Sequence, residues 1–351
     1  MSLVELLVAI GVGLIASLAI FQVFAMFEGQ KRTTTSGGDA QTNGALALFS
    51  IEHDLRQAGY GINTPDYYGC TILAWDKQQG GGTAFNMTLA PVIITQGAAG
   101  APDSLTMLYG TNDLLPNPAT VIQNMTSPIA DIVVGNRYGF GAGDVVIVAE
   151  AGLNCTLAQI SSLPTAAGQT NNVVHGDTNY VDPNTGATLP TRYNKAAGLG
   201  VTYTSAAKLF SIGTLPVNNV YSVQSGQLML QQMLSAASPA ATALFDGIVQ
   251  MQAQYGKDTI GGDGIVDVYD EVAPATAAAW AQVLAVRVAV VARASQYEKD
   301  VVSPASIKLW NDSAIAPTTT GPTWTLTAAE QHYRYKIYQS IIPVRNMMWT
   351  P

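Results

Sequence analysis

The sequence is poor in charge. Only 11% of its 351 residues are Asp, Glu, Lys or Arg, well under the roughly 25% of ordinary soluble proteins. The balance is acidic, with a net charge of −8, and apart from Lys31-Arg32 the basic residues are scattered. Nucleic-acid binding through phosphates requires a clustered basic surface. The composition therefore excludes nucleic acid as a principal partner.

Motifs of catalysis are also missing. The three histidines, His53, His175 and His332, lie far apart and form no HExxH pair. The chain contains no P-loop, no GxSxG elbow and no GxGxxG segment after a strand. These absences favour a protein that is not an enzyme, and they point to no organic cofactor.

Cysteine is scarce as well. Cys70 and Cys155 cannot form a CxxC metal site or a haem attachment motif. In an oxidising compartment we expect one disulfide closing a loop of about 85 residues, worth about 4 kcal/mol in the chain-entropy model. The alternative is a pair of unpaired buried thiols.

One long apolar run stands out against this background. Residues 6–27 (LLVAIGVGLIASLAIFQVFAMF) carry no charged side chain, and about 20 apolar residues are enough for a helix to cross a bilayer. Glu5 lies at the edge of the run, where burial in lipid costs about 2.5–3.5 kcal/mol. A charge in such a place indicates a function. The alternative is a membrane anchor with an incidental Glu near the interface.

Residues 1–6 (MSLVEL) followed by this run resemble the N-terminus of a mature type IV pilin. Met1 stands where that family usually has Phe. The resemblance implies that the carboxylate of Glu5 pairs with the free amine of Met1 in a neighbouring subunit. Both charges are poorly solvated in an apolar filament core, so removing one leaves the other buried and unpaired, at a cost of several kcal/mol. The pairing would set the stagger between subunits.

The resemblance also implies processing. In that family a short basic leader is cut before the first residue and the new amino group is methylated. The first basic residues here, Lys31 and Arg32, follow the apolar run, which by the positive-inside rule would leave the bulk of the chain in the cytoplasm. A basic leader before residue 1 reverses that orientation. We therefore expect the numbering to begin at the processed residue.

Helical signal continues beyond the apolar run. Ala45, Leu48, Ile51 and Leu55 recur at roughly helical spacing with Phe49 alongside, and Gly59 and Gly61 follow as a stop. One helix over residues 1–58 would be about 85 Å long, with a kink or loosened turn expected at residues 37–38 because paired glycines destabilise a helix. We divide the chain into a membrane or filament-core helix (1–30), its amphipathic continuation (31–60) and a β-rich head (61–351).

Further segments are similar to PilW-type minor pilins. The matches are scattered along the whole chain and are specific only in combination and order. They are residues 39–45 (DAQTNGA), 51–60 (IEHDLRQAGY), 69–70, 143–148 (GDVVIV) with Cys155 following, 255–268 (YGKDTIGGDGIVDV) and 343–346 (PVRN).

The chain after residue 62 is typical of strands. Short β-type runs bounded by Gly, Pro, Asn or Asp occupy residues 92–95, 104–108, 144–149, 156–160, 248–255, 283–294 and 335–344. In residues 283–294 one alternating face is continuously aliphatic, which suits a sheet packed on the long helix. Residues 161–226 are expected to form loops and short strands, 303–322 to form a loop, and 228–243 to be partly irregular. The fold class is therefore α+β: a pilin helix whose C-terminal half packs on an antiparallel β-sheet head with large loop insertions.

The densest acidic cluster contains Asp258, Asp263, Asp267 and Asp270. Together with the glycines of residues 261–264, it resembles a degenerate calcium loop, in which oxygen ligands circle a hard cation. Carboxylates so close together repel one another without a cation. The two interpretations are a calcium site and a solvated acidic β-turn.

Three roles follow from the resemblance. The first is a repeating structural subunit that is inserted in the bacterial inner membrane and then assembled into an extracellular filament with copies of itself. The second is a minor pilin at the tip, acting in assembly priming or in adhesion through the 160–245 loops. The third is a pseudopilin of a type II secretion machine. In each role the partners are other pilins and the pilus assembly machinery.

Overall fold

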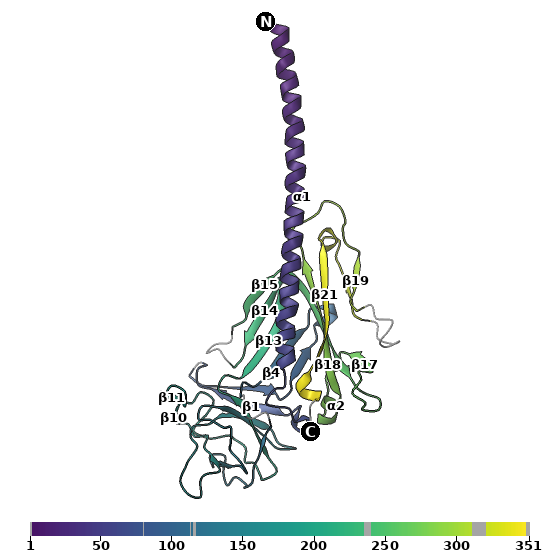
Figure 1. The fold of residues 1–351 in the computed structure, drawn as a ribbon. Helices are drawn as coiled ribbons and strands as arrows, with labels where there is room; N and C mark the ends of the chain where they lie inside the picture. The colour runs from purple at the N-terminus through teal and green to yellow at the C-terminus, as the bar shows by residue number, and fades with distance from the viewer. Residues whose placement is uncertain are drawn as a thin grey trace.

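The computed structural model describes residues 2–79, 81–112, 114, 117–234, 240–310 and 321–348. A single long helix, α1 (Leu3–Gln57), projects from a β-rich head (Figure 1). The expected α+β composition is confirmed. The short helical segments of the head are α2 (Ala277–Ala281), α3 (Arg345–Met348) and the 3-10 turns η1 (Pro65–Tyr67), η2 (Ala98–Gly100) and η3 (Glu330–His332).

Two antiparallel sheets flank the lower half of α1 (Figure 1). The five-stranded sheet has the order β15-β14-β13-β4-β3 and contains β3 (Val92–Thr95), β4 (Ser104–Tyr109), β13 (Val217–Gln224), β14 (Gln227–Gln232) and β15 (Thr242–Asp246). The four-stranded sheet has the order β17-β16-β18-β21 and contains β16 (Ile248–Lys257), β17 (Val268–Asp270), β18 (Val283–Arg293) and β21 (Tyr335–Pro343).

A third sheet lies at the end of the head farthest from the N-terminus (Figure 1). Its order is β2-β1-β8-β7-β12-β5, and it contains β1 (Thr71–Asp76), β2 (Thr83–Thr88), β5 (Ala119–Thr120), β7 (Val145–Ala149), β8 (Cys155–Gln159) and β12 (Lys208–Gly213). β1 pairs with β8 in parallel, which departs from the antiparallel expectation. Strand pairs β6 (Ile132–Val133) with β9 (Asn172–Val173), β10 (Asn179–Val181) with β11 (Thr188–Pro190) and β19 (Ser306–Lys308) with β20 (Thr323–Thr325) complete the described strands.

The lower half of α1 packs through one helical stripe. Its buried positions recur every three or four residues, as one helix face requires, and they are Ser36, Ala40, Gly44, Ala47, Leu48, Ile51, Asp54, Leu55 and Ala58, the last just beyond the helix end. Ala45, which the sequence grouped with Leu48, Ile51 and Leu55, is exposed, and so is Phe49. Each follows a stripe residue directly, and one residue turns the chain by about 100° around the helix axis.

Two expectations about α1 have different outcomes. The helix runs unbroken through Gly37 and Gly38, so the loosened turn is not observed. The helix ends at Gln57, and Gly59 and Gly61 follow with φ of 85° and 80°, a left-handed conformation that glycine adopts without strain. The predicted stop is therefore confirmed.

β18 is buried on both faces. Val286, Val288 and Val290 belong to the core beneath α1, as predicted from the aliphatic face. The opposite face, with Ala289 and Val291, is covered by residues 307–310 and 324–326. A strand covered on both sides reads as a nearly continuous apolar run, which explains the strength of this signal in the sequence.

The middle of the chain contains more buried strand than the sequence predicts. Within 161–226, expected to be surface loops and short strands, β12 is almost wholly buried and β13 lies at the centre of the five-stranded sheet. β14 lies in the segment expected to be partly irregular (228–243), and β15 begins at the end of that segment. The buried asparagines of β13 and the glutamines of β14 give these strands a polar composition that conceals them. Residues 303–322 were expected to form a loop, but their described part contains the short strand β19; residues 311–320 lie outside the described residues.

Candidate assembly surface and its support

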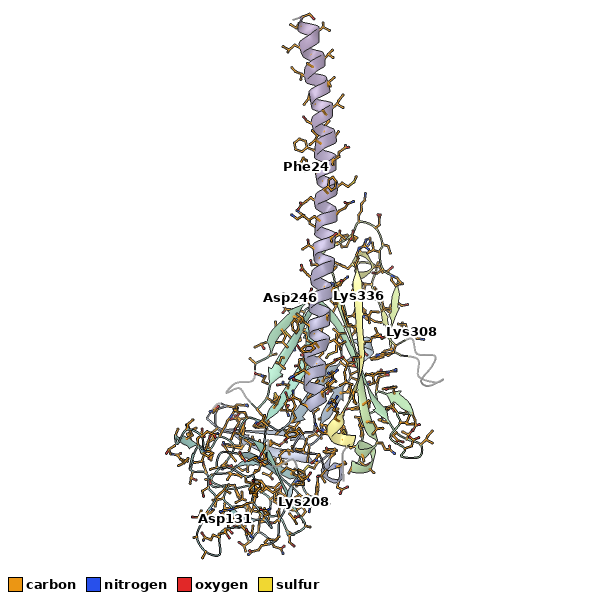
Figure 2. The ribbon with its side chains drawn as sticks, viewed as in Figure 1. Phe24, Asp131, Lys208, Asp246, Lys308 and Lys336 are labelled. Atoms are coloured by element: carbon orange, nitrogen blue, oxygen red, sulfur yellow. A yellow bond between two sulfur atoms is a disulfide. The ribbon has the colours of Figure 1, made fainter. Side chains whose placement is uncertain are left out.

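The upper half of α1 is a bare apolar surface. From Leu3 to Phe27 its large apolar side chains are between 50% and 78% exposed; Phe24 projects well above the head in Figure 2. The most apolar window of this helix has a mean hydropathy of 2.5 and none of it is buried. By length and composition the helix is able to cross a membrane. A monomer in water would leave this surface uncovered.

The two residues predicted to pair between subunits lie at the tip of this surface. Met1 is outside the described residues, and Glu5 lies near the start of α1, where only its backbone is described. Their pairing stays a prediction.

Ser36 is the first buried residue of α1, and it contacts the head. Just before it, Arg32 and Glu28 form an exposed ion pair of 3.2 Å between Nε and Oε1. The buried Ser36 hydroxyl accepts a hydrogen bond of 3.0 Å from the backbone N–H of Gln296 and lies 3.1 Å from Oγ of Ser295. The boundary between bare and packed helix therefore lies within the polar stretch that follows the apolar run.

Gly44 allows the four-stranded sheet to approach α1 closely. A Cβ atom at this position would lie 2.3 Å from the ring of Tyr338 in β21 and 2.9 Å from Cβ of Ala292 in β18. The Tyr338 hydroxyl donates a hydrogen bond of 2.8 Å to the carbonyl of Gln41. The contact therefore requires a residue without a side chain on this face of the helix.

A buried carboxylate fixes the last turn of α1 to the five-stranded sheet. Asp54 Oδ1 accepts a hydrogen bond from the Tyr109 hydroxyl at 3.2 Å. Oδ2 accepts from Asn219 Nδ2 at 2.7 Å and from the Tyr221 hydroxyl at 2.8 Å. Burial, and then the neighbouring Asp54, raise the pKa of both tyrosines, so both hydroxyls remain protonated donors.

The end of α1 is capped by the end of the chain. Asn346 Nδ2, just after β21, donates to the carbonyls of Gln57 and Ala58 at 3.1 and 3.0 Å. Asp54 and Asn346 both lie in segments that the sequence matched by resemblance alone, without a role. One signal for Asp54 was available: it is a charged residue directly beside Leu55 on the apolar stripe.

The predicted disulfide is present. Cys70, just before β1, is joined to Cys155 at the start of β8, with their Cα atoms 5.9 Å apart. The bond lies beside the parallel pairing of Ile72 with Cys155. It therefore fastens two strands that are 85 residues apart in sequence.

The acidic loop is organised by its own backbone. Asp258 accepts hydrogen bonds from the N–H groups of Gly262 and Gly264, Asp263 from Ile265, and Asp267 from Thr259 and Ile260. Asp270 forms an ion pair of 2.6 Å with Lys257. Within the part of the chain that the structure describes, no group of three or more His, Cys, Asp or Glu gathers to hold a metal ion. Calcium binding at this loop stays a prediction.

Asp103 and Asp76 are two of the buried carboxylates of the head that have shifted pKa values. Burial, with a smaller contribution from Glu271, raises the pKa of Asp103 to about 6. Burial acts the same way on Asp76, but the Arg192 guanidinium and the N–H of Gln78 outweigh it and lower the pKa of Asp76 below its ordinary value. The Arg192–Asp76 pair is bidentate, at 2.8 and 2.6 Å.

The head therefore holds the lower half of α1, and the upper half of α1 is uncovered. The family model for PilW, type IV pilus-assembly protein W, matches residues 209–346. This part of the chain resembles a PilW-type pilus protein. The matched region runs from β12 into α3 and includes β15, β16, β18 and β21, which contact α1, and the predicted resemblance is confirmed over this region. Neither a curated protein nor a solved structure matches the chain.

Proposed function

We propose that this PilW-type protein is a repeating structural subunit of an extracellular, type IV pilus-like filament. It polymerises through the upper half of α1, and the Glu5 carboxylate pairs with the Met1 amine of a neighbouring subunit. The observation that carries the proposal is the exposed apolar surface between Leu3 and Phe27.

The physical argument is about what covers that surface. Before assembly, the bilayer of the inner membrane provides an apolar environment for the helix. When the helix leaves lipid, it requires an equally apolar environment, and the same surfaces of neighbouring subunits provide it through close packing. The proposed pathway therefore runs from the inner membrane to a surface filament. Its partners are copies of this chain, other pilins and the assembly machinery, and no catalysis is involved.

Substitution of Glu5 tests the pairing. We expect Glu5→Ala to insert into the membrane normally but to reduce the yield of sheared filaments strongly, because the partner amine is left buried and unpaired. Glu28→Ala is the matched control in the same helix, since the Glu28 carboxylate is exposed and in an ion pair with Arg32. Filament yields that are equal for the Glu5→Ala variant and the unaltered protein would remove Glu5 from the proposal.

The PilW match supports a second role, because the matching model is that of an assembly protein. In this role the chain is a minor subunit at the filament tip, acting in priming or adhesion. Mass spectrometry of purified, sheared filaments separates the two roles. A dominant chain with a methylated Met1 is the repeating subunit, whereas a trace species beside a smaller pilin is a minor one. A type II secretion pseudopilin, the third role, gives filaments too short to isolate.

A further inference from the structure

A small cavity opens on the six-stranded sheet of the head. Its volume is about 160 Å³, and one side is formed by β1 and β2, where Leu73 pairs with Asn86 and Trp75 with Ala84. The segment 193–199 closes the other side. In Figure 1 this sheet lies at the end of the head opposite the bare part of α1, so bundling of the helices leaves the cavity open to solvent.

The interior of the cavity is mainly apolar. Its aliphatic lining comes from Leu73, Ala74, Leu157, Ala158 and Leu199. An apolar cavity of roughly 150 Å³ holds a benzene ring. The space available here therefore matches one ring-sized body.

The polar groups that line the cavity are largely engaged with the protein. Asn194 Nδ2 donates to the carbonyls of Gln159 and Gly176. The Thr156 hydroxyl is hydrogen-bonded to the Tyr203 hydroxyl at 2.7 Å. His175 Nε2 lies 2.9 Å from the carbonyl of Ala130, and burial lowers the pKa of His175, which keeps the imidazole neutral.

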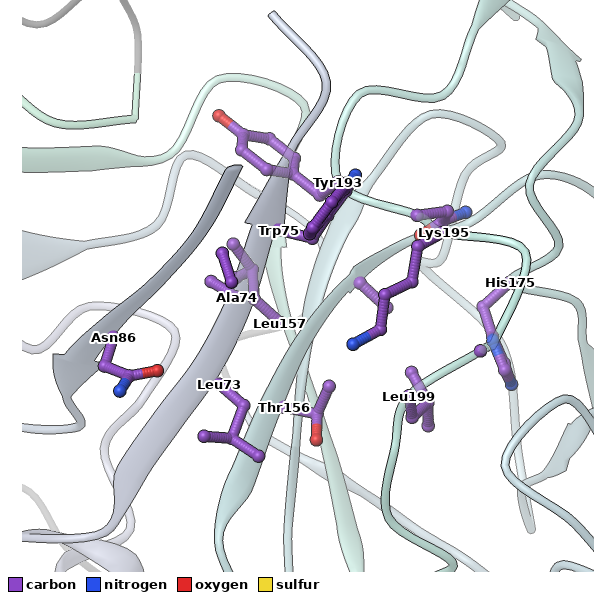
Figure 3. Close-up of a pocket in the computed structure, with 14 residues that line it drawn as sticks. Leu73, Ala74, Trp75, Asn86, Thr156, Leu157, His175, Tyr193, Lys195 and Leu199 are labelled. Carbon is purple, nitrogen blue, oxygen red and sulfur yellow. The ribbon is translucent and has the colours of Figure 1, made fainter. Parts of the chain in front are cut away.

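Lys195 is different. Figure 3 shows its side chain reaching in between Leu157 and Leu199. Among the described residues, the structure gives its ammonium group no hydrogen-bond or ion-pair partner, and no Asp or Glu is among the residues lining the cavity. In a chain with a net charge of −8, a half-buried cation facing an apolar space is left to bind an anion from outside the molecule.

We propose that this cavity binds a small organic acid, with its ring-sized apolar body against the aliphatic lining formed by Leu73, Leu157 and Leu199 and its carboxylate on the Lys195 ammonium. The site requires both parts of the ligand. The apolar body removes aliphatic surface from water, and the carboxylate provides a charge-assisted hydrogen bond. Binding at this site does not depend on filament formation.

Benzoate is the probe, and binding to the full-length protein in detergent is followed by calorimetry. We expect saturable binding to the unaltered protein and a loss of about tenfold in affinity for Lys195→Met, which keeps the length of the side chain and removes the charge. Lys308→Met on β19, a charge removed far from the cavity, is expected to bind benzoate normally. Benzamide, with the ring but without the charge, is expected to bind as weakly as benzoate binds to the Lys195→Met variant.

Two results would overturn the assignment. One is the absence of saturable binding to the unaltered protein at millimolar benzoate. The other is equal binding of benzoate to the unaltered protein and the Lys195→Met variant, which places the ion elsewhere. To locate the site, Leu199→Trp fills the cavity from the wall that also carries Lys195 and is expected to abolish binding, and its melting curve checks that the head stays folded. Filament yield is measured on the same variants, and we expect it to be unchanged.

Discussion

Asp54 places a charge on the packed side of α1, where it meets three donors from two strands of the five-stranded sheet. Asp54→Ala would leave those donors buried without an acceptor. We expect it to reduce the free energy of unfolding by about 3 kcal/mol, measured by chemical denaturation of the full-length protein in detergent. Asp66→Ala, at an exposed residue of η1, is the control and is expected to change little. A small effect of Asp54→Ala would mean that the tyrosines find water instead.

Asp103 gives the head a pH dependence. The unfolded chain releases this proton near pH 4, whereas the folded chain holds it until about pH 6. The folded state therefore binds more protons over that interval, and its stability falls as the pH rises from about 4 to about 6. Asp76 has a lowered pKa and acts in the opposite sense, so its contribution is present above about pH 4 and lost at lower pH.

A thermal unfolding series from pH 3 to pH 8 measures both effects. We expect Asp103→Asn to lower the melting temperature throughout, because one of the two backbone N–H groups that Asp103 accepts from loses its partner. The decline between about pH 4 and pH 6 should become shallower with the loss of the Asp103 carboxyl group, while the part due to Asp144, whose pKa is also raised by burial, should remain. If Asp103→Asn keeps the same slope, another group is responsible for it.

The roles of single residues are the features that the sequence predicts least well. Cys70 and Cys155 were predictable because two cysteines in an oxidising compartment leave one pairing. Asp54 and Asn346 have roles that depend on partners more than 50 residues away, and no local pattern encodes such distances. The sequence offered only the misplaced charge beside Leu55 as a clue.

At the scale of elements, two glycines of the same helix are expected to respond in opposite ways. A Cβ at Gly37 meets nothing within 4 Å, so Gly37→Ala is expected to stabilise the protein by up to about 1 kcal/mol through helix propensity. Gly44→Ala drives a methyl group into Tyr338 and Ala292 and is expected to destabilise by about 1–3 kcal/mol. Parallel melting curves of the two variants test this difference. Stabilisation by Gly44→Ala would show that β21 yields without cost.

The elements themselves were predicted unevenly. The ends of α1 and the strands β3, β16 and β18 follow from periodicity and from glycine stops, which are local signals. β13 was missed because its buried Asn218 and Asn219 make it look like a loop. Asn219 is buried because it serves Asp54. A hydrophobicity pattern does not identify a buried strand when the polar residues of that strand belong to a buried hydrogen-bond network.

For the whole molecule, the disulfide is expected to carry much of the stability of the six-stranded sheet. It restrains 85 residues of the unfolded chain, worth about 4 kcal/mol in the chain-entropy model. We expect reduction, or the Cys70→Ala/Cys155→Ala double variant, to lower the melting temperature and to expose β1 and β8 to hydrogen exchange first. An unchanged melting temperature under reducing conditions would contradict this.

The arrangement of α1 also determines how the molecule bears load. The helix is 55 residues long, about 80 Å, and only its lower half is held. A pull on the bare end passes down one continuous rod to Ser36, Gly44 and Asp54 in turn. β18 and β21 run roughly along the rod in Figure 1, so tension reaches their ladder in shear, with many hydrogen bonds resisting together. We therefore expect these strands to resist a pull along α1 better than strands that are separated one hydrogen bond at a time.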